Sequence, residues 1–221
     1  MLGDKDIHID VMCDEVIHNS LEHTIEKYDK GATILFELPA ENYFNANSTA
    51  VKYLLDSGYE GLYVSFQRPY KNIAHLFEKF GIDKDKIIII DCATLNESEN
   101  PADDNVCIDV DVSSEDANCI AQKIIKSLDS LKSKNRFVLI DSLTTFALYK
   151  NNSEITKLAE ILINVRNKDD DENLLVLFNV VEELVKKKCI QDITLHIDEV
   201  INVLSCAEKY SQEIINHDLL T

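Results

Sequence analysis

The chain has 221 residues, 45% of them hydrophobic, and its 40 acidic and 22 basic residues give a formal net charge of −18. This length and hydrophobic content suffice for one sizeable core, so one domain with short terminal additions is expected. Nucleic-acid binding is not expected, because phosphate neutralisation needs clustered Lys and Arg. The longest apolar runs fall far short of the about 20 residues that cross a bilayer, and no leader peptide is apparent. A cytoplasmic protein without membrane contact is therefore expected.

Helices and strands are predicted to alternate along the whole chain. Helices are indicated by apolar residues three or four apart with Ser, Asp or Gly at the ends, and strands by short apolar runs. In chain order we predict helix 10–28, strand 32–38, loop 39–47, helix 48–57 capped by Ser48, strand 61–66, helix 69–80, strand 86–91, strand 106–112, a helix starting at 113–116, a strand ending at Asp141, helix 153–165, strand 174–180, helix 182–187, strand 199–204 and helix 206–217. Strands that are apolar on both faces belong to a parallel sheet with helices on each side.

The six cysteines form no CxxC pair and no short repeat. In a chain of this size that pattern is typical of reduced, buried, small hydrophobic residues, not of a disulfide framework or a zinc site. The cysteines are Cys13, Cys92, Cys107, Cys119, Cys189 and Cys206.

The strand 136–141 ends on Asp141, and Ser142 follows it. In nucleotide-hydrolysing α/β proteins an aspartate at this position, the Walker B pattern, orders magnesium beside the phosphates. The alternative is that Asp141 caps a turn at the end of the strand through local hydrogen bonds. We favour the turn cap, because one carboxylate without phosphates offers magnesium too few ligands. Asp141 is thus only a weak metal candidate, and no metal is predicted.

The region 31–204 resembles the KaiC-like branch of the RecA-fold ATPases. Four pieces carry the resemblance, in the order that the family has them: 33–39 at the entry to the phosphate loop, 58–66 at the second strand, 137–143 at Walker B and 197–201 where the sheet closes. The resemblance implies a RecA-like three-layer α/β/α fold with a central, mostly parallel sheet and extra helices at the N- and C-termini.

The same resemblance divides the chain into three parts. We expect an N-terminal helical segment, residues 1–30, that packs on the main domain. Residues 31–205 then form the RecA/KaiC-like α/β domain, and residues 206–221 form a C-terminal helix.

The expected phosphate loop departs from the motif GxxxxGK[ST], whose glycines wrap the phosphates and whose lysine reaches the β and γ phosphates. Pro39 corresponds to a proline common in the family's loop. In that register Glu37 and Asn42 take the glycine positions, Tyr43 the lysine and Phe44 the hydroxyl. No residue of this register supplies the motif's chemistry.

Matching the following helix instead places Ala46, Asn47 and Ser48 at the last glycine, the lysine and the hydroxyl. Neither register supplies a lysine, and one of them places a carboxylate, Glu37 or Glu41, among the phosphates. Such a carboxylate repels a triphosphate by roughly 1 to 4 kcal/mol per pair of unit charges near a surface. The alternative is an ordinary loop of an α/β protein that never held phosphate, and it predicts the same lack of tight nucleotide binding.

KaiC-like proteins carry adjacent glutamates after the second strand, and one of them acts as general base on the attacking water. The corresponding residues here are Gln67 and Arg68. An amide is not basic and a guanidinium stays protonated, so neither accepts that proton. The resemblance therefore implies the fold of an ATPase whose lysine, loop glycines and base are all missing.

Two further groups have the ligand types of a metal site. Asp10, Asp14, His18 and Glu22 share one face of the first predicted helix, and oxygen ligands alternate in the run 167–173. We interpret the first group as the polar side of an amphipathic helix. The second lacks the glycine and terminal glutamate of a calcium loop, which favours a solvated turn.

Two hypotheses for the function follow. The first is a catalytically inactive KaiC-like protein that acts as a regulatory, signalling or scaffolding subunit, with an active KaiC-like ATPase or another copy of itself as protein partner. The alternative is an atypical nucleotide-binding protein or weak ATPase, in which Asp141, Ser142, Ser48 and Thr49 replace the lost loop. Only the alternative needs ATP and magnesium. The first is preferred, so neither enzyme activity nor a cofactor is expected.

Overall fold

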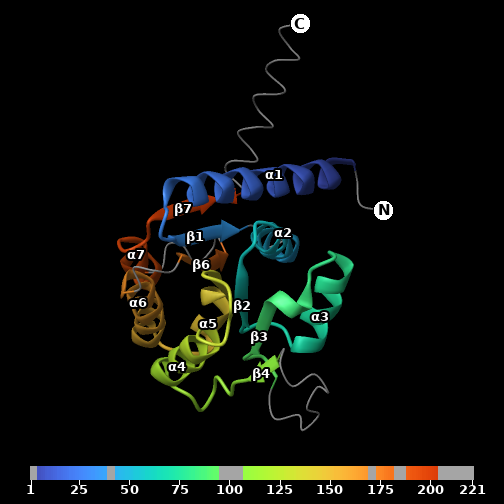
Figure 1. Cartoon of the computed structure of the whole chain (residues 1–221). Helices are drawn as coiled ribbons and strands as arrows, with labels where there is room; N and C mark the ends of the chain where they lie inside the picture. The colour runs from blue at the N-terminus through green and yellow to red at the C-terminus, as the bar shows by residue number, and fades with distance from the viewer. Residues whose placement is uncertain (1–3, 39–42, 95–106, 169–172, 182–187, 204–221) are drawn as a thin grey trace, which may run out of the picture.

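Figure 1 shows the computed structural model, which describes residues 4–38, 43–94, 107–168, 173–181 and 188–203. Helices and strands alternate through most of these residues. The elements are α1 Asp4–Lys27, β1 Thr33–Leu38, α2 Tyr43–Asp56, β2 Glu60–Ser65, α3 Tyr70–Lys79, a 3₁₀ turn Lys84–Lys86, β3 Ile87–Asp91, β4 Cys107–Asp109, α4 Ala117–Leu128, β5 Asn135–Asp141, α5 Leu143–Tyr149, α6 Asn152–Lys168, β6 Asn173–Val181, α7 Lys188–Thr194 and β7 Glu199–Asn202.

The described strands form one sheet in the order β4-β3-β2-β5-β6-β1-β7. Every pair of neighbouring strands is parallel, so all carboxyl ends lie along one edge of the sheet. The register places Ser65 beside Asp141, at the ends of the neighbouring strands β2 and β5. This confirms the predicted α/β architecture with a parallel central sheet.

Helices cover both faces of this sheet, as the runs of apolar residues in its strands require. One core cluster joins the sheet to α1, α2 and α3, and a second joins the other face to α4, α5, α6 and α7. Alternate residues of β1 divide accordingly: Ile34 and Phe36 belong to the first cluster and Leu35 to the second. The result is the three-layer α/β/α arrangement of a RecA-like fold (Figure 1).

Hydrogen bonds at the start of β7 attach this edge strand to β1. Asp198 Oδ2 accepts from the backbone N–H and from the hydroxyl of Thr33, both at 2.8 Å. The ammonium group of Lys27, in the last turn of α1, pairs with the carboxylate of Glu199. The piece 197–201 of the sequence thus closes the sheet, as the resemblance implied.

Two predictions for the helices were wrong. The helix expected to start at Ser48 begins at Tyr43, and Ser48 is buried inside it instead of capping it. The short helix α5 was not predicted, because it follows Asp141 after a single residue, Ser142, whose hydroxyl caps it. The helices predicted at 182–187 and 206–217 lie outside the described residues.

The cysteines only partly follow the prediction. The structure buries Cys13, Cys92 and Cys189, but Cys119 is exposed on α4. Burial raises the pKa of the Cys92 thiol far above its ordinary value, so this thiol stays protonated and unreactive. No described helix is long and apolar enough to cross a membrane.

Gly61 on β2 lies too close to the neighbouring strand β5 to carry a side chain. A Cβ atom at this position would lie 2.4 Å from the ring of Phe137, its fully buried neighbour on β5. We expect Gly61→Ala to lower the free energy of unfolding by about 2 kcal/mol through overpacking. Urea denaturation would measure this. Adding Phe137→Leu should recover part of the loss, and strictly additive effects would contradict the proposed clash.

Candidate functional site

The carboxylate of Asp141 lies at the carboxyl end of β5 and is fully buried. Strand alternation points its side chain to the face covered by α2, the face on which Phe137 and Leu139 pack. Two tyrosine hydroxyls donate to it: Tyr43 to Oδ1 and Tyr63 to Oδ2. Both tyrosines are only 2% exposed. Each oxygen of this carboxylate is therefore occupied by a phenol from another element of the fold.

The hydrogen bonds continue from Tyr63 across the sheet. Asn47, one turn after Tyr43 in α2, donates to the hydroxyl of Tyr63 at 3.4 Å. Asn179 on β6 donates in turn to the side-chain oxygen of Asn47. We call Tyr43, Asn47, Tyr63, Asp141 and Asn179 the tyrosine–aspartate network. It joins α2 to β2, β5 and β6, and all five members are buried.

Burial also sets the protonation of this network. Loss of solvation raises the pKa of Asp141 to about 6, although the hydrogen bonds from both tyrosines and the charge of Arg68 act in the opposite direction. The pKa values of Tyr43 and Tyr63 are well above 10, because both phenols are buried next to the Asp141 charge. Near neutral pH the phenols are therefore donors, and Asp141 is the titrating group.

The prediction that Asp141 caps a turn was wrong. Its hydrogen-bond partners are hydroxyls from α2 and β2, far away in sequence, because its side chain points to the α2 face. The local cap is the next residue, Ser142, whose hydroxyl accepts from the backbone N–H of Thr145 at 3.1 Å.

The four vestigial candidates for nucleotide binding have different hydrogen-bond partners and degrees of burial. Ser48 is buried within α2, and Thr49 donates to a carboxylate oxygen of Asp14 on α1 at 2.6 Å. Ser142 is used as the cap of α5. Of the four, only Asp141 belongs to the tyrosine–aspartate network.

The residues at the expected catalytic base lie near this network. Gln67 is exposed, and Arg68 is half-buried. The guanidinium carbon of Arg68 lies 3.1 Å from the ring centroid of Phe44, so the cation stacks on the second residue of α2. Its backbone N–H also donates to the Ser65 hydroxyl at 3.0 Å. These contacts fix Arg68 at the carboxyl edge of the sheet, beside Asp141.

No group of three or more potential metal ligands occurs among the described residues. On α1, His18 and Glu22 are exposed, Asp14 binds Thr49, and the His18 ring contacts the Tyr53 ring edge-to-face at 4.5 Å. The polar face of α1 thus contacts α2 at two points. Asp10 and the run 167–173 are not fully described.

The sequence did not reveal the second buried carboxylate at this edge, Asp91 at the end of β3. It accepts from the backbone N–H groups of Tyr70, Ala93 and Thr94 and from the Thr94 hydroxyl, at 2.6 to 3.0 Å. Among its four donors is the backbone N–H of Tyr70, which makes Asp91 a structural anchor for the start of α3. The signal that could have identified it is an aspartate at the end of an apolar strand, the same pattern as at Asp141.

Asp91→Asn should lower the free energy of unfolding by about 2 kcal/mol, because an amide nitrogen replaces one acceptor and faces donors. A chemical denaturation curve would measure this. Asp83→Asn, in an exposed turn where the carboxylate bonds with Asp85 and Lys86, is the matched control with little effect expected. Equal losses for the two variants would argue against an anchoring role of Asp91.

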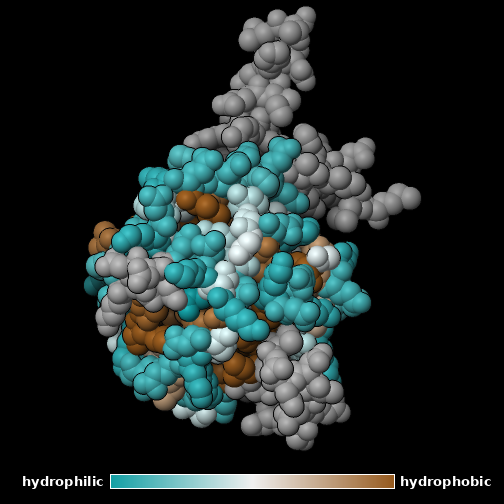
Figure 2. All heavy atoms as spheres, viewed as in Figure 1, coloured by the Kyte–Doolittle hydropathy of each residue, from teal (hydrophilic) through white to brown (hydrophobic). Residues whose placement is uncertain are grey.

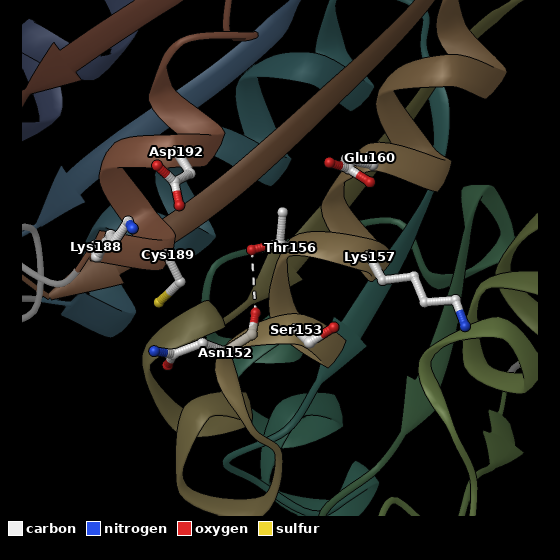
Figure 3. Close-up of a pocket in the computed structure, with 8 residues that line it drawn as sticks. All are labelled: Asn152, Ser153, Thr156, Lys157, Glu160, Lys188, Cys189 and Asp192. Atoms are coloured by element: carbon white, nitrogen blue, oxygen red, sulfur yellow. Dashed lines mark hydrogen bonds between the residues drawn. The ribbon is translucent and has the colours of Figure 1, made fainter.

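A groove of about 530 Å³ lies between α6 and α7 (Figure 3). Charged side chains of both signs line it from the two helices, and Thr156 within it donates to the backbone oxygen of Asn152 at 3.0 Å. The lining residues are Asn152, Ser153, Thr156, Lys157, Glu160, Lys188, Cys189 and Asp192. None of them belongs to the tyrosine–aspartate network or to the residues predicted to bind nucleotide.

Comparison with protein families gives one match. Residues 66–180, from the end of β2 through β6, match the model of the family described as Elongator subunit Iki1. No curated protein matches the chain.

Solved structures share the architecture at low sequence identity. An uncharacterised protein from Pyrococcus horikoshii, crystallised with an unknown peptide, is 13% identical, with 76% of each chain covered and a TM-score of 0.53. A KaiC-like protein from the same organism is 16% identical over 74% of this chain and 68% of its own, with a TM-score of 0.49. The RadB recombinase is 15% identical over 77% and 73%, with a TM-score of 0.46. Identities this low inform on the fold alone.

Proposed function

The chain belongs to the Elongator subunit Iki1 family, whose model covers residues 66–180, and we propose that it is a non-catalytic subunit that works through protein contacts. Its RecA-like domain then serves as a scaffold and not as a nucleotide-hydrolysing enzyme. The partners proposed for it are other subunits of Elongator, including an active KaiC-like ATPase or further copies of the same chain.

The hydrogen bond from Tyr43 to Asp141 carries this proposal. Tyr43 takes the lysine position in the register fixed by Pro39, and its hydroxyl sits on the carboxylate that would order magnesium. Asp141 has no exposed surface, and Tyr63 occupies its second oxygen. Magnesium needs direct or water-mediated access to such a carboxylate. A bound ion would have to displace a buried tyrosine.

The surroundings of Arg68 support the same proposal. The position of the expected general base holds an exposed amide, Gln67, and a guanidinium stacked on Phe44. Neither group can take a proton from water near neutral pH. Loss of the base and occupation of the carboxylate are separate changes, and each one is sufficient to prevent hydrolysis by the usual route.

Thermal denaturation with ATP, ADP or GTP and magnesium tests the absence of nucleotide binding. A ligand at about 100 times its Kd would raise the free energy of unfolding by about 2.7 kcal/mol. We expect no shift at millimolar nucleotide. A clear shift with turnover would instead favour the atypical nucleotide-binding protein.

The variant Tyr43→Lys places the motif's cation beside Asp141. We expect it neither to bind nucleotide nor to hydrolyse it, because the glycines and the base are still missing. Gained affinity would mean that the pocket is otherwise preserved. Tyr43→Met, similar in length but uncharged, controls for loss of the phenol.

Reconstitution tests the subunit role. The chain, mixed with the other Elongator subunits of its source organism, should form a stoichiometric complex by light scattering. Its charge of −18 favours a basic partner surface, so the complex should weaken with salt. The face shown in Figure 2 is mostly hydrophilic, with hydrophobic patches between the hydrophilic residues. Asp141→Asn should assemble normally. A chain that stays free under these conditions would contradict the proposal.

A further inference from the structure

The groove between α6 and α7 has a carboxylate on each of its two walls. Figure 3 shows Glu160 on α6 and Asp192 on α7 at the same end of the groove, on opposite sides of it. Both side chains are exposed. Within the part of the chain that the structure describes, neither carboxylate has a hydrogen-bond or ion-pair partner. Both are therefore free to bind a cation that enters the groove.

The two lysines of the groove do not neutralise this end. The ammonium group of Lys157 points away from α7 in Figure 3. It acts on Asp116 at the start of α4, whose pKa is held below its ordinary value mainly by the backbone N–H of Cys119 and in smaller part by the charge of Lys157. Lys188, in the first turn of α7, is then the one cation left to face two carboxylates. The groove is thus negative at the end of Glu160 and Asp192.

The lining between the two helices is only weakly polar. The Thr156 hydroxyl donates to the backbone oxygen of Asn152 within α6, which leaves its methyl group as contact surface. The thiol of Cys189 is buried on the opposite wall. A long basic side chain suits this combination, because its methylene stem can lie on the methyl group and the thiol while its head reaches the carboxylates. Arginine suits it best, since its planar fork can bond with both carboxylates at once.

Exposed apolar side chains lie near the other end of the groove. Leu148 and Tyr149, at the end of α5, are 76% and 48% exposed. Tyr149 precedes Asn152, which lines the groove at this end, by three residues. From Asn152 to Glu160 the helix rises by about 12 Å. An extended peptide covers that distance in about four residues. A bound segment could therefore touch the apolar pair and the carboxylates together.

We propose that the groove between α6 and α7 binds an extended basic segment of a partner protein. An Arg or Lys of this segment lies between Glu160 and Asp192, and an apolar residue about four positions away lies on Leu148 and Tyr149. The charge of −18 on the whole chain favours the same partner chemistry. This inference rests on the proposed subunit role, because it names the surface through which a partner is held.

Peptide selection on the free chain tests the groove without any Elongator subunit. Peptides selected from a random phage-displayed library on the full chain should carry Arg or Lys and, about four positions away, a large apolar residue. The double variant Glu160→Lys with Asp192→Lys should weaken the binding of a selected peptide at least tenfold by fluorescence anisotropy. The matched control makes the same charge change at Glu78 and Asp85, which are exposed on the opposite face of the molecule. It should change the affinity less than twofold.

The same variants separate this inference from the proposed function. In the reconstituted complex the change at Glu160 and Asp192 should weaken assembly at least tenfold, and the control should assemble like the wild type. A complex that forms equally well with both variants would overturn the groove as the binding site and leave the subunit role standing. Selected peptides that lack basic residues, or that bind the wild type and the charge-reversed variant equally, would overturn the inference even if no complex forms.

Discussion

Asp141→Asn should raise the stability of the protein at pH 7 by up to about 3 kcal/mol, the free energy that corresponds to a pKa of about 6 against 3.8 in the unfolded chain. The physical reason is burial: at pH 7 folding must keep a carboxylate charged although it is fully buried. An asparagine has nearly the same shape and presents one acceptor and one donor group to the two tyrosine hydroxyls. Because hydroxyls both donate and accept, the network stays satisfied.

Comparison of the wild type with Asp141→Asn also predicts how Asp141 changes the free energy of unfolding with pH. The folded state binds the Asp141 proton more tightly than the unfolded state, so this residue favours folding at low pH. That contribution is lost as the pH rises from about 4 through 6. As the pH falls from 7 to 4, the free energy of unfolding of the wild type should therefore rise by about 2 kcal/mol relative to that of Asp141→Asn.

Urea denaturation of both proteins from pH 4 to pH 8 measures this difference, and the other carboxylates cancel in it. A difference that does not change with pH would show that Asp141 titrates like an exposed aspartate. Asp129→Asn, at the exposed end of α4, is the matched control.

Hydrophobic pattern was sufficient to predict most of the fold. The isoleucine run of β3 and the apolar runs ending at Ser65 and Asp141 are apolar on both faces, which only a covered parallel sheet satisfies. The pattern failed at the start of α2. Tyr43 and Asn47 begin this helix because their side chains bond with residues of other strands, and such contacts leave no trace in local sequence.

The candidate site was predictable only in part. The resemblance placed Asp141 at the end of a central strand and Tyr43 at the lysine position, and both positions lie at the carboxyl edge. It could not show that the two side chains bond to each other, nor that Tyr63 joins them from β2. The sequence does not assign Tyr63 to the site, because a tyrosine that only packs in the core would occupy an apolar strand equally well.

Tyr43→Ala should lower the free energy of unfolding at pH 7 by about 4 kcal/mol. Two losses add: the buried ring leaves a cavity, and Asp141 keeps a charged oxygen without a donor. Tyr43→Phe, which keeps the ring, should cost about 2 kcal/mol and separates the two terms. Denaturation curves at one pH measure both variants.

The hydroxyl term can be assigned to Asp141 by a double-mutant cycle. Its hydrogen bond lowers the pKa of Asp141, so Tyr43→Phe should raise that pKa further and cost less stability at pH 5 than at pH 7. In the Asp141→Asn background the same change removes a bond to a neutral group, and the loss should fall to about 1 kcal/mol. If Tyr43→Phe lowered the free energy of unfolding equally in both backgrounds, the Tyr43 hydroxyl and Asp141 would not be energetically coupled. The Tyr43 hydroxyl would then stabilise the fold independently of Asp141, and its occupation of the magnesium position would be incidental.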